Sequence, residues 1–121
     1  MARVGYRDPV GKAAKMLPTI AIWLLVAAFF GAGLFNAIGT TATQDSFVRW
    51  GYPRWWYRIT GGLEMANSVL IALPASRRIG LVFGAIIIGA ALVTVLGHRE
   101  FSHVAPLSLF VALLVLVAMI A

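Results

Sequence analysis

The sequence predicts an all-α integral membrane protein: an antiparallel bundle of four transmembrane helices with a short aromatic interfacial segment between the first two. Hydrophobic residues make up 61% of the 121 residues and charged residues only 12%, whereas soluble domains carry roughly 25% charged residues. Four apolar stretches are also long enough to cross about 30 Å of hydrocarbon. Because so short a chain cannot bury this much apolar surface in a soluble core, we infer that the bilayer is its solvent.

The chain is predicted to form one membrane domain, residues 1–121, in which a basic N-terminal segment (1–16) precedes spans at 19–39, 57–74, 79–96 and 104–121. The first, third and fourth spans contain no charged residue, whereas the second contains Glu64 and is identified by its flanks. A belt of aromatic and basic residues, typical of a membrane interface, leads into it: Trp50, Tyr52, Trp55, Trp56 and Tyr57, with Arg54 and Arg58. The short connection after Pro74 makes the second and third helices antiparallel neighbours.

Lysine and arginine predict the orientation of the bundle, because they are enriched in cytoplasmic connections. Six lie on the side of the N-terminus, namely Arg3, Arg7, Lys12, Lys15, Arg77 and Arg78, and four lie opposite, namely Arg49, Arg54, Arg58 and Arg99. This bias places both termini in the cytoplasm.

Several kinds of site are not expected from the sequence. The chain has no cysteine, which excludes disulfides and thiolate metal sites. Its net charge of +6 is spread over the ends of apolar spans rather than gathered on one face, so nucleic acid is not an expected partner. The two histidines, His98 and His103, flank a single connection, which does not suit haem ligation from facing helices. No catalytic residue and no metal site is predicted.

Glu64 is the residue of greatest interest, because a carboxylate at mid-membrane costs at least about 2.5 kcal/mol on insertion scales. It should therefore face the bundle interior, be protonated or have a partner. Helical spacing places polar or small residues on its face of the second span: Tyr57, Thr60, Gly61, Glu64, Asn67 and Ser68. Apolar residues such as Leu63 and Leu73 form the opposite face.

The third span has a comparable stripe, formed by Gly80, Gly84, Ile87, Ala91, Thr94 and His98. We expect Gly61, Gly80 and Gly84 to support close helix packing. Since the two helices are antiparallel, Glu64 and His98 are predicted to converge near Thr94 in the outer half of the membrane. A polar cluster of Asn36, Glu64, Asn67, Thr94 and His98 would then face a ligand or partner under the aromatic connection. The alternative is a structural hydrogen-bond network without a ligand.

Short motifs resemble a known family. They are Gly33-Leu34-Phe35-Asn36, Gly51-Tyr52-Pro53, Gly61-Gly62-Leu63-Glu64 and Gly97-His98. Over roughly residues 20 to 120 the chain resembles the DoxX-like family of small bacterial four-helix membrane proteins. The resemblance implies the bacterial cytoplasmic (inner) membrane. The name-giving member is a membrane subunit of a thiosulfate:quinone oxidoreductase, and other relatives look like chaperones or scaffolds. The chain departs from the family pattern at Asn36, where many relatives carry a lysine, so the resemblance does not imply a charge-paired site at Glu64.

Two functions follow as hypotheses. The first is a non-enzymatic accessory or assembly subunit of a larger membrane complex, quinone-linked or electron-transferring, whose partners are the lipid bilayer and other membrane subunits or further copies of this chain. The alternative is a quinone or lipid site that uses Glu64 and His98 to handle protons. No intrinsic cofactor is expected, and quinone or lipid is the candidate bound molecule. A self-contained transporter is less favoured, because neither inverted repeats nor broken helices are evident.

Overall fold

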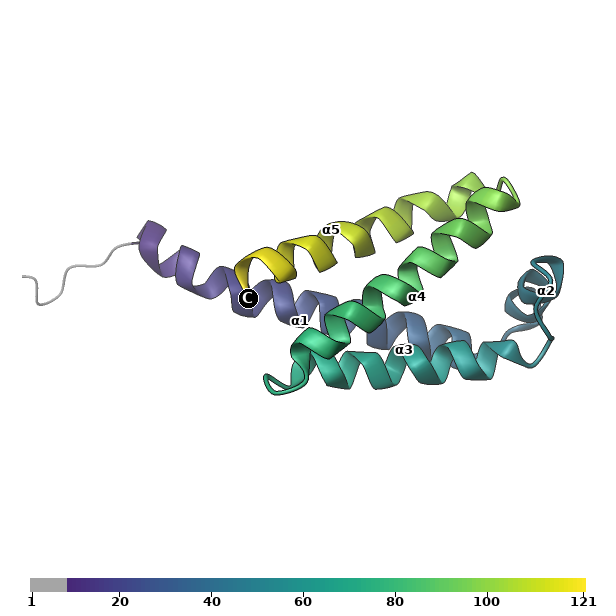
Figure 1. Ribbon diagram of the computed structural model, residues 1–121, viewed down its shortest axis with the longest axis horizontal. Helices are drawn as coiled ribbons and strands as arrows, with labels where there is room; N and C mark the ends of the chain where they lie inside the picture. Colours follow the sequence, from purple (N-terminus) through teal and green to yellow (C-terminus); the bar gives the residue numbers. More distant parts are fainter. Residues whose placement is uncertain (1–8) are drawn as a thin grey trace, which may run out of the picture.

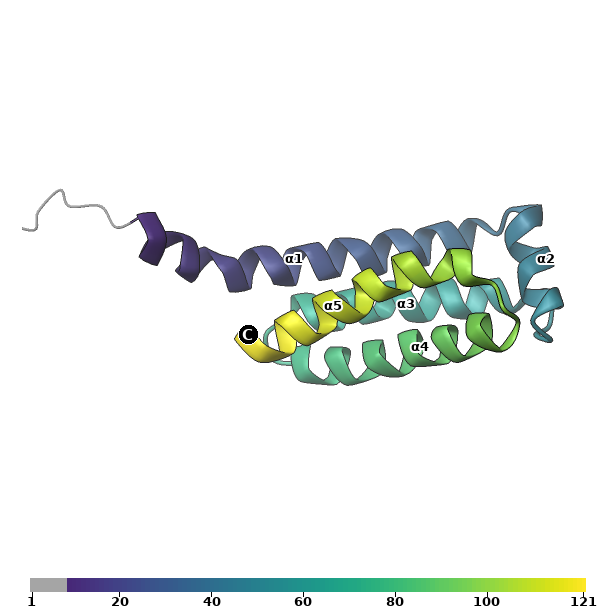
Figure 2. The same cartoon turned by 90° about the horizontal axis from the view of Figure 1, so that it is seen from above.

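The computed structural model describes residues 9–121, and the regular secondary structure of this part of the chain is all helical, without strands. Its elements are α1 (Pro9–Ile38), α2 (Thr41–Arg49), α3 (Trp56–Ala72), α4 (Arg77–Gly97), a 3-10 turn η1 (Phe101–His103) and α5 (Val104–Ile120). Successive long helices run in opposite directions, and α2 lies across the end where α1 stops and α3 begins (Figure 1). Figure 2 shows that the N-terminal part of α1 extends beyond the other helices. The all-α fold class is confirmed.

Three helical segments are long and apolar enough to cross a membrane: α1, α4 and the continuous stretch Phe101–Ile120. The remaining predicted span corresponds to α3, which has 17 residues and includes Glu64. This helix is shorter than predicted because Leu73, the residue before Pro74, adopts an extended backbone conformation, as steric clash with a following proline ring requires. Length and composition therefore support three of the four predicted spans.

The first helix begins earlier than predicted. Residues 9–16, assigned from the sequence to a basic segment that precedes the first span, form the first turns of α1, and Lys12 and Lys15 are exposed on them. Residues 1–8 of that segment lie outside the described residues. Pro9 suits the start of a helix because its fixed φ is helical and its missing N–H leaves no donor unpaired in the first turn. Consequently α1 is longer than one membrane span requires.

The predicted interfacial segment contains a helix that the sequence analysis missed. Gly39 (φ +65°) ends α1 in a left-handed conformation, which glycine adopts without steric cost. Thr40 then starts α2, because its side-chain oxygen accepts a hydrogen bond from the Thr43 backbone N–H at 3.2 Å. Thr43 and Phe47, four residues apart, form the buried face of this nine-residue helix. The chain thus folds a short amphipathic helix across one end of the bundle.

The closest helix contact joins α1 to α3 through two facing glycines. A Cβ atom on Gly61 would lie 2.7 Å from the Gly33 carbonyl oxygen and 2.6 Å from the Ala37 nitrogen. A Cβ atom on Gly33 would lie 2.8 Å from the Gly61 carbonyl oxygen. Both residues are buried, so backbone packs directly against backbone, as small residues allow in membrane helices. Gly61 was predicted from the sequence, whereas Gly33 was not singled out for packing.

The other two predicted packing glycines bring only the first half of α4 into close contact with neighbouring helices. A Cβ atom on Gly80 would lie 2.7 Å from the Ile71 side chain, and one on Gly84 would lie 2.9 Å from Phe29 on α1. Gly89 and Gly97, farther along α4, have no such neighbour within 4 Å. Figure 1 shows α4 diverging from α3 as it runs toward its C-terminal end. The bundle is consequently tight at the α3–α4 turn and wider beneath α2.

Candidate functional site: a cavity beneath the short helix

Glu64 is buried between α1 and α3 with a single amide partner. Its side chain is 5% exposed, and the Asn36 amide donates a hydrogen bond to one carboxylate oxygen at 2.5 Å. Among the described residues, no hydrogen bond to the second carboxylate oxygen is found. The Gly33–Gly61 contact sets this pair, since each partner lies one helical turn (three residues) beyond a glycine in its own helix. A buried carboxylate with a free acceptor is therefore placed inside the bundle.

A cavity of about 790 Å³ lies beside this pair. Its walls come from α1, α3, α4, α5 and η1, and α2 with the following connection closes one end. Most of the lining is apolar, including Phe35, Phe47 and Phe110. The cavity arises where α4 and α5 diverge from α1 and α3, because no packing glycine draws the second half of α4 inward.

The polar groups of the cavity are few and lie on several helices. Besides Asn36 and Glu64, they include Thr60 on α3 and a hydrogen bond between the Tyr52 and Thr94 hydroxyls, 2.9 Å long. Tyr52 also stacks on Trp56, with ring centroids 5.9 Å apart. Within the described chain, no lysine or arginine lines the cavity. The site can thus offer hydroxyl, amide and carboxylate groups, but no basic side chain other than His103.

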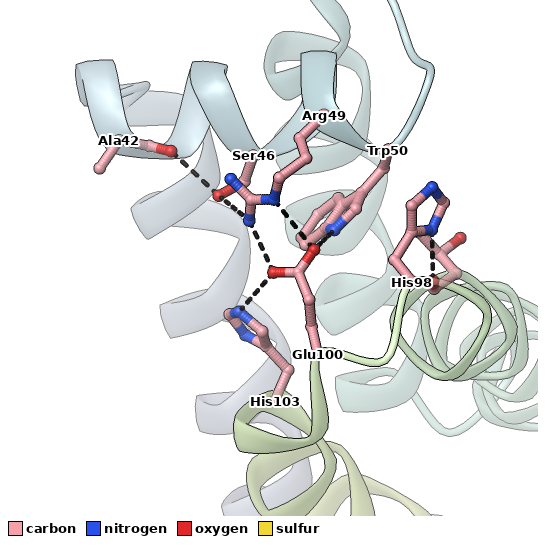
Figure 3. A network of polar contacts seen from close by, with 8 residues as sticks. Ala42, Ser46, Arg49, Trp50, His98, Glu100 and His103 are labelled. Atoms are coloured by element: carbon pink, nitrogen blue, oxygen red, sulfur yellow. Dashed lines mark hydrogen bonds and ion pairs between the residues drawn. The ribbon is translucent and has the colours of Figure 1, made fainter.

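Glu100 attaches α2 to the connection between α4 and α5. Figure 3 shows its carboxylate facing Arg49 and Trp50, with His103 nearby. Arg49 donates two hydrogen bonds to it, at 2.6 Å from Nη2 and 3.0 Å from Nε, and the Trp50 indole N–H donates a third. His103 Nε2 lies 3.8 Å from the same carboxylate. We call Arg49, Trp50, Glu100 and His103 the Glu100 clasp. It holds α2 in place over one end of the cavity.

The clasp keeps its carboxylate ionised. The hydrogen bonds from Arg49, reinforced by Trp50 and the nearby charges, lower the pKa of Glu100 to about 2, although desolvation opposes this shift. The same contact raises the pKa of Arg49. Because the pKa of the acid is depressed on folding, its contribution to stability is present above the ordinary carboxyl value and is lost as the pH falls through about 2. The clasp is therefore closed at neutral pH.

Neutralising Glu100 should loosen α2. Glutamine at position 100 keeps the side-chain shape and removes the charge that holds Arg49, so we expect α2 to leave the bundle more often. The chain lacks cysteine, so one cysteine can serve as a reporter. Thr43→Cys, on the buried face of α2, should react about fivefold faster with a water-soluble maleimide when Glu100 is replaced. Val48→Cys, on the exposed face, should react equally in both backgrounds. Equal rates at Thr43→Cys would show that the clasp does not hold α2.

The predicted cluster is only partly assembled at the cavity. Asn36, Glu64 and Thr94 line it, but Asn67 and His98 do not. His98 is exposed and bonds the Thr94 carbonyl oxygen of its own helix at 2.9 Å, so its predicted convergence with Glu64 is not found. The physical reason is that α4 diverges from α3 at this end and His98 lies just beyond the last turn.

The aromatic and basic belt is divided between cavity and surface. Trp50, Tyr52 and Trp56 line the cavity, whereas Trp55 is exposed. Arg54 pairs with Asp45 at 2.9 Å on the surface, and the Arg58 guanidinium lies over the ring of Tyr57.

The sequence analysis missed Thr43, Ser46, Phe47 and Glu100. The first three had a signal in the sequence, because the spacing of three and four between them predicts one face of a helix.

Asn67 is buried without a hydrogen-bond partner. Its side chain is 2% exposed, and neither amide atom has a partner within the described residues. A Cβ atom on Gly84 would lie 3.1 Å from the Asn67 amide nitrogen, so this glycine makes room for the side chain. An unsatisfied amide in a dry interior costs free energy, and Asn67 is thus a weak point of the core.

Replacing Asn67 by leucine should stabilise the protein. The two side chains have the same number of heavy atoms with the same branching at Cγ, and the substitution removes two unpaired polar atoms, so we expect a gain of about 1 kcal/mol in the free energy of unfolding. Thermal unfolding in detergent would measure it. Ser68→Leu is the matched control and should destabilise, because the Ser68 hydroxyl donates a 2.6 Å hydrogen bond to the Met65 carbonyl. A loss of stability in Asn67→Leu would mean that this amide has a partner, such as a buried water.

A comparison with known protein families shows to which family the chain belongs. The model of the DoxX-like family matches residues 20–118. The protein belongs to the DoxX-like family. No curated protein and no solved structure gave a significant match. The family match together with the apolar helices makes this DoxX-like protein a membrane protein.

Proposed function

We propose that this DoxX-like protein is a non-enzymatic component of a bacterial cytoplasmic membrane that binds a quinone or a lipid in its cavity. The observation that carries the proposal is a largely apolar cavity with the Asn36–Glu64 pair in its wall. Small-molecule sites commonly combine apolar walls with a few polar groups that orient the ligand. Glu64 and Asn36 take the head of the ligand in this proposal. His98 has no part in it, since it lies outside the cavity.

Binding can be measured through the tryptophans of the cavity. Trp50 and Trp56 line it, so a quinone that binds there should quench tryptophan fluorescence in a saturable manner in nanodiscs. Glu64→Gln should weaken the affinity for the reduced quinol, measured by its competition with the quinone, about tenfold, because a quinol hydroxyl donates a charge-assisted hydrogen bond to the Glu64 carboxylate. Ser68→Ala, at a buried position on the same helix outside the cavity, is the control and should leave it unchanged. Quenching that never saturates, or equal affinities for wild type and Glu64→Gln, would contradict the proposal.

The proposal includes a crossing of the membrane by α3, with both termini in the cytoplasm. A helix of 17 residues extends about 25 Å, which is the lower end of the range for a span. Its polar side is buried against the bundle, whereas Leu63, Val69 and Leu73 are exposed. Single cysteines at Ala75 and Ser102 should be labelled by an impermeant maleimide from opposite sides, with Ser102→Cys outside. Labelling of both from one side would contradict this topology.

The second candidate function is that of an accessory or assembly subunit in a quinone-linked or electron-transfer complex, and exposed small residues favour it. Gly31 on α1 and Gly62 on α3 are exposed and have no neighbour within 4 Å of an added Cβ atom. Ala66 follows Gly62 by one turn and is also exposed. Such pairs let a further helix approach closely. Native membranes purified in mild detergent should yield a stoichiometric partner that Gly62→Leu removes, while a chain that always runs alone would contradict this role.

A further inference from the structure

The cavity has a mouth on the side of the molecule that faces lipid. Two of its lining residues, Leu63 on α3 and Ile86 on α4, are nevertheless 56% and 60% exposed. A residue can line a cavity and remain mostly exposed only at its rim. Phe35 on α1 is a third rim residue of this kind. The cavity is therefore continuous with the exterior between the helices.

The Leu63–Ile86 rim lies at the depth of the hydrocarbon. Leu63 precedes the end of α3 by nine residues, and Ile86 follows the start of α4 by nine residues. Since the two helices are antiparallel and joined by a short turn, both side chains lie about 13 Å from that turn. This height is roughly halfway across a bilayer core. An opening here meets lipid chains and not water.

The end of the cavity under α2, by contrast, is closed. Thr43 and Phe47 on α2 are buried there, and the Glu100 clasp holds the helix in place with three hydrogen bonds from Arg49 and Trp50. The Tyr52–Thr94 hydrogen bond joins the following connection to α4. Passage from water would require these bonds to break, whereas passage from the membrane between Leu63 and Ile86 breaks none of them.

The charges of the cavity constrain the head of a ligand. Among the residues that the structure describes, the only carboxylate that lines it is Glu64, and the only basic side chain is His103 at the clasp. A phosphate, sulfate or carboxylate head would meet the carboxylate of Glu64 without a guanidinium or ammonium to neutralise it, and such unpaired burial is costly. A hydroxyl head can instead donate a hydrogen bond to Glu64, and a hydroxyl or carbonyl head can accept one from the Asn36 amide or the Thr60 hydroxyl.

We propose that the cavity takes its ligand laterally from the bilayer, between Leu63 and Ile86, and selects long-chain molecules with a neutral hydroxyl or carbonyl head against anionic lipids. The head lies at Asn36 and Glu64, and the chain leaves through the rim into the membrane. This inference rests on the proposed function, because it specifies the route and the chemical class of the ligand in the same cavity.

Photolabelling in nanodiscs tests both parts. The probes are a long-chain alcohol with a diazirine in its chain and the alkyl sulfate of the same length and diazirine position, which is permanently charged. The alcohol should label wild-type peptides that contain Leu63 or Ile86 about tenfold more than the sulfate does. In Glu64→Gln this preference should narrow, because the repelling carboxylate is gone. Equal labelling of these peptides by the two probes in the wild type would overturn the selection by charge.

A blocked rim tests the route. Leu63→Trp adds bulk at the opening and should reduce labelling by the alcohol severalfold. Leu73→Trp is the matched control, because Leu73 is equally exposed at the end of α3 but does not line the cavity. Unchanged labelling in Leu63→Trp would overturn the lateral route while leaving binding itself intact. If neither probe labelled the wild type and quinone quenching did not saturate, the proposed function would fail, and this inference with it.

Discussion

Alanine at position 61 should lower the free energy of unfolding by about 1–3 kcal/mol, because the new methyl group has no space between α1 and α3. Its Cβ atom would lie within 3 Å of the Gly33 carbonyl and of the Ala37 backbone. Backbone atoms cannot rotate away as a flexible side chain could, so the two helices must separate. The Asn36–Glu64 hydrogen bond, one turn farther along each helix, should lengthen as a result.

The control is the adjacent residue. Gly62 is exposed, and an added Cβ atom there meets nothing within 4 Å, so Gly62→Ala should gain up to about 1 kcal/mol from the higher helix propensity of alanine. The two substitutions thus have opposite expected signs in neighbouring positions of one helix. Thermal unfolding in a single detergent, followed by circular dichroism, measures both. A stabilised Gly61→Ala would show that α1 and α3 do not pack as closely as described.

Leucine at position 36 should destabilise the protein by about 1–3 kcal/mol, because it leaves the buried Glu64 without its only hydrogen-bond donor among the described residues. Replacing both partners should restore most of that loss, since Asn36→Leu with Glu64→Leu leaves no polar group unpaired. The single variant is expected to lose more than the double variant because an unpaired buried polar group costs much free energy, whereas a formed hydrogen bond gives only a small net gain.

A double-mutant cycle in detergent measures this coupling. The cycle consists of wild type, Asn36→Leu, Glu64→Leu and the double variant, each unfolded under the same conditions. We expect a coupling free energy of at least about 1 kcal/mol between residues 36 and 64. Additive effects would indicate that the hydrogen bond contributes nothing, and the Asn36–Glu64 pair could then not orient a ligand head.

The cavity follows from the uneven distribution of small residues along α4. Gly80 and Gly84 bring its first half against Ile71 and Phe29, while isoleucine, valine and threonine side chains occupy much of the second half. The separation of α4 and α5 from α1 and α3 at this end exposes interior polar groups, and α2 covers them. A bundle whose helices spread apart at one end, where α2 covers them, thus provides a ligand-sized space in a chain of 121 residues.

Local patterns predicted a large part of this molecule. The apolar runs identify α1, α4 and α5, because span length is set by the thickness of the bilayer. The spacing of Gly61, Glu64 and Asn67 identifies the buried face of α3, because a helix repeats every 3.6 residues. The membrane class and the family likewise follow from the sequence by itself.

The tertiary structure alone decided which polar groups meet. Helical spacing placed His98 on the face of Thr94, yet divergence of α4 leaves His98 exposed. Glu100 was not singled out in the sequence, yet it binds Arg49, 51 residues earlier in the chain. Both outcomes depend on the angle between helices and on where α2 lies, and neither is encoded in the spacing within one helix. The sequence determined what each helix presents, and packing between helices determined which groups surround the cavity.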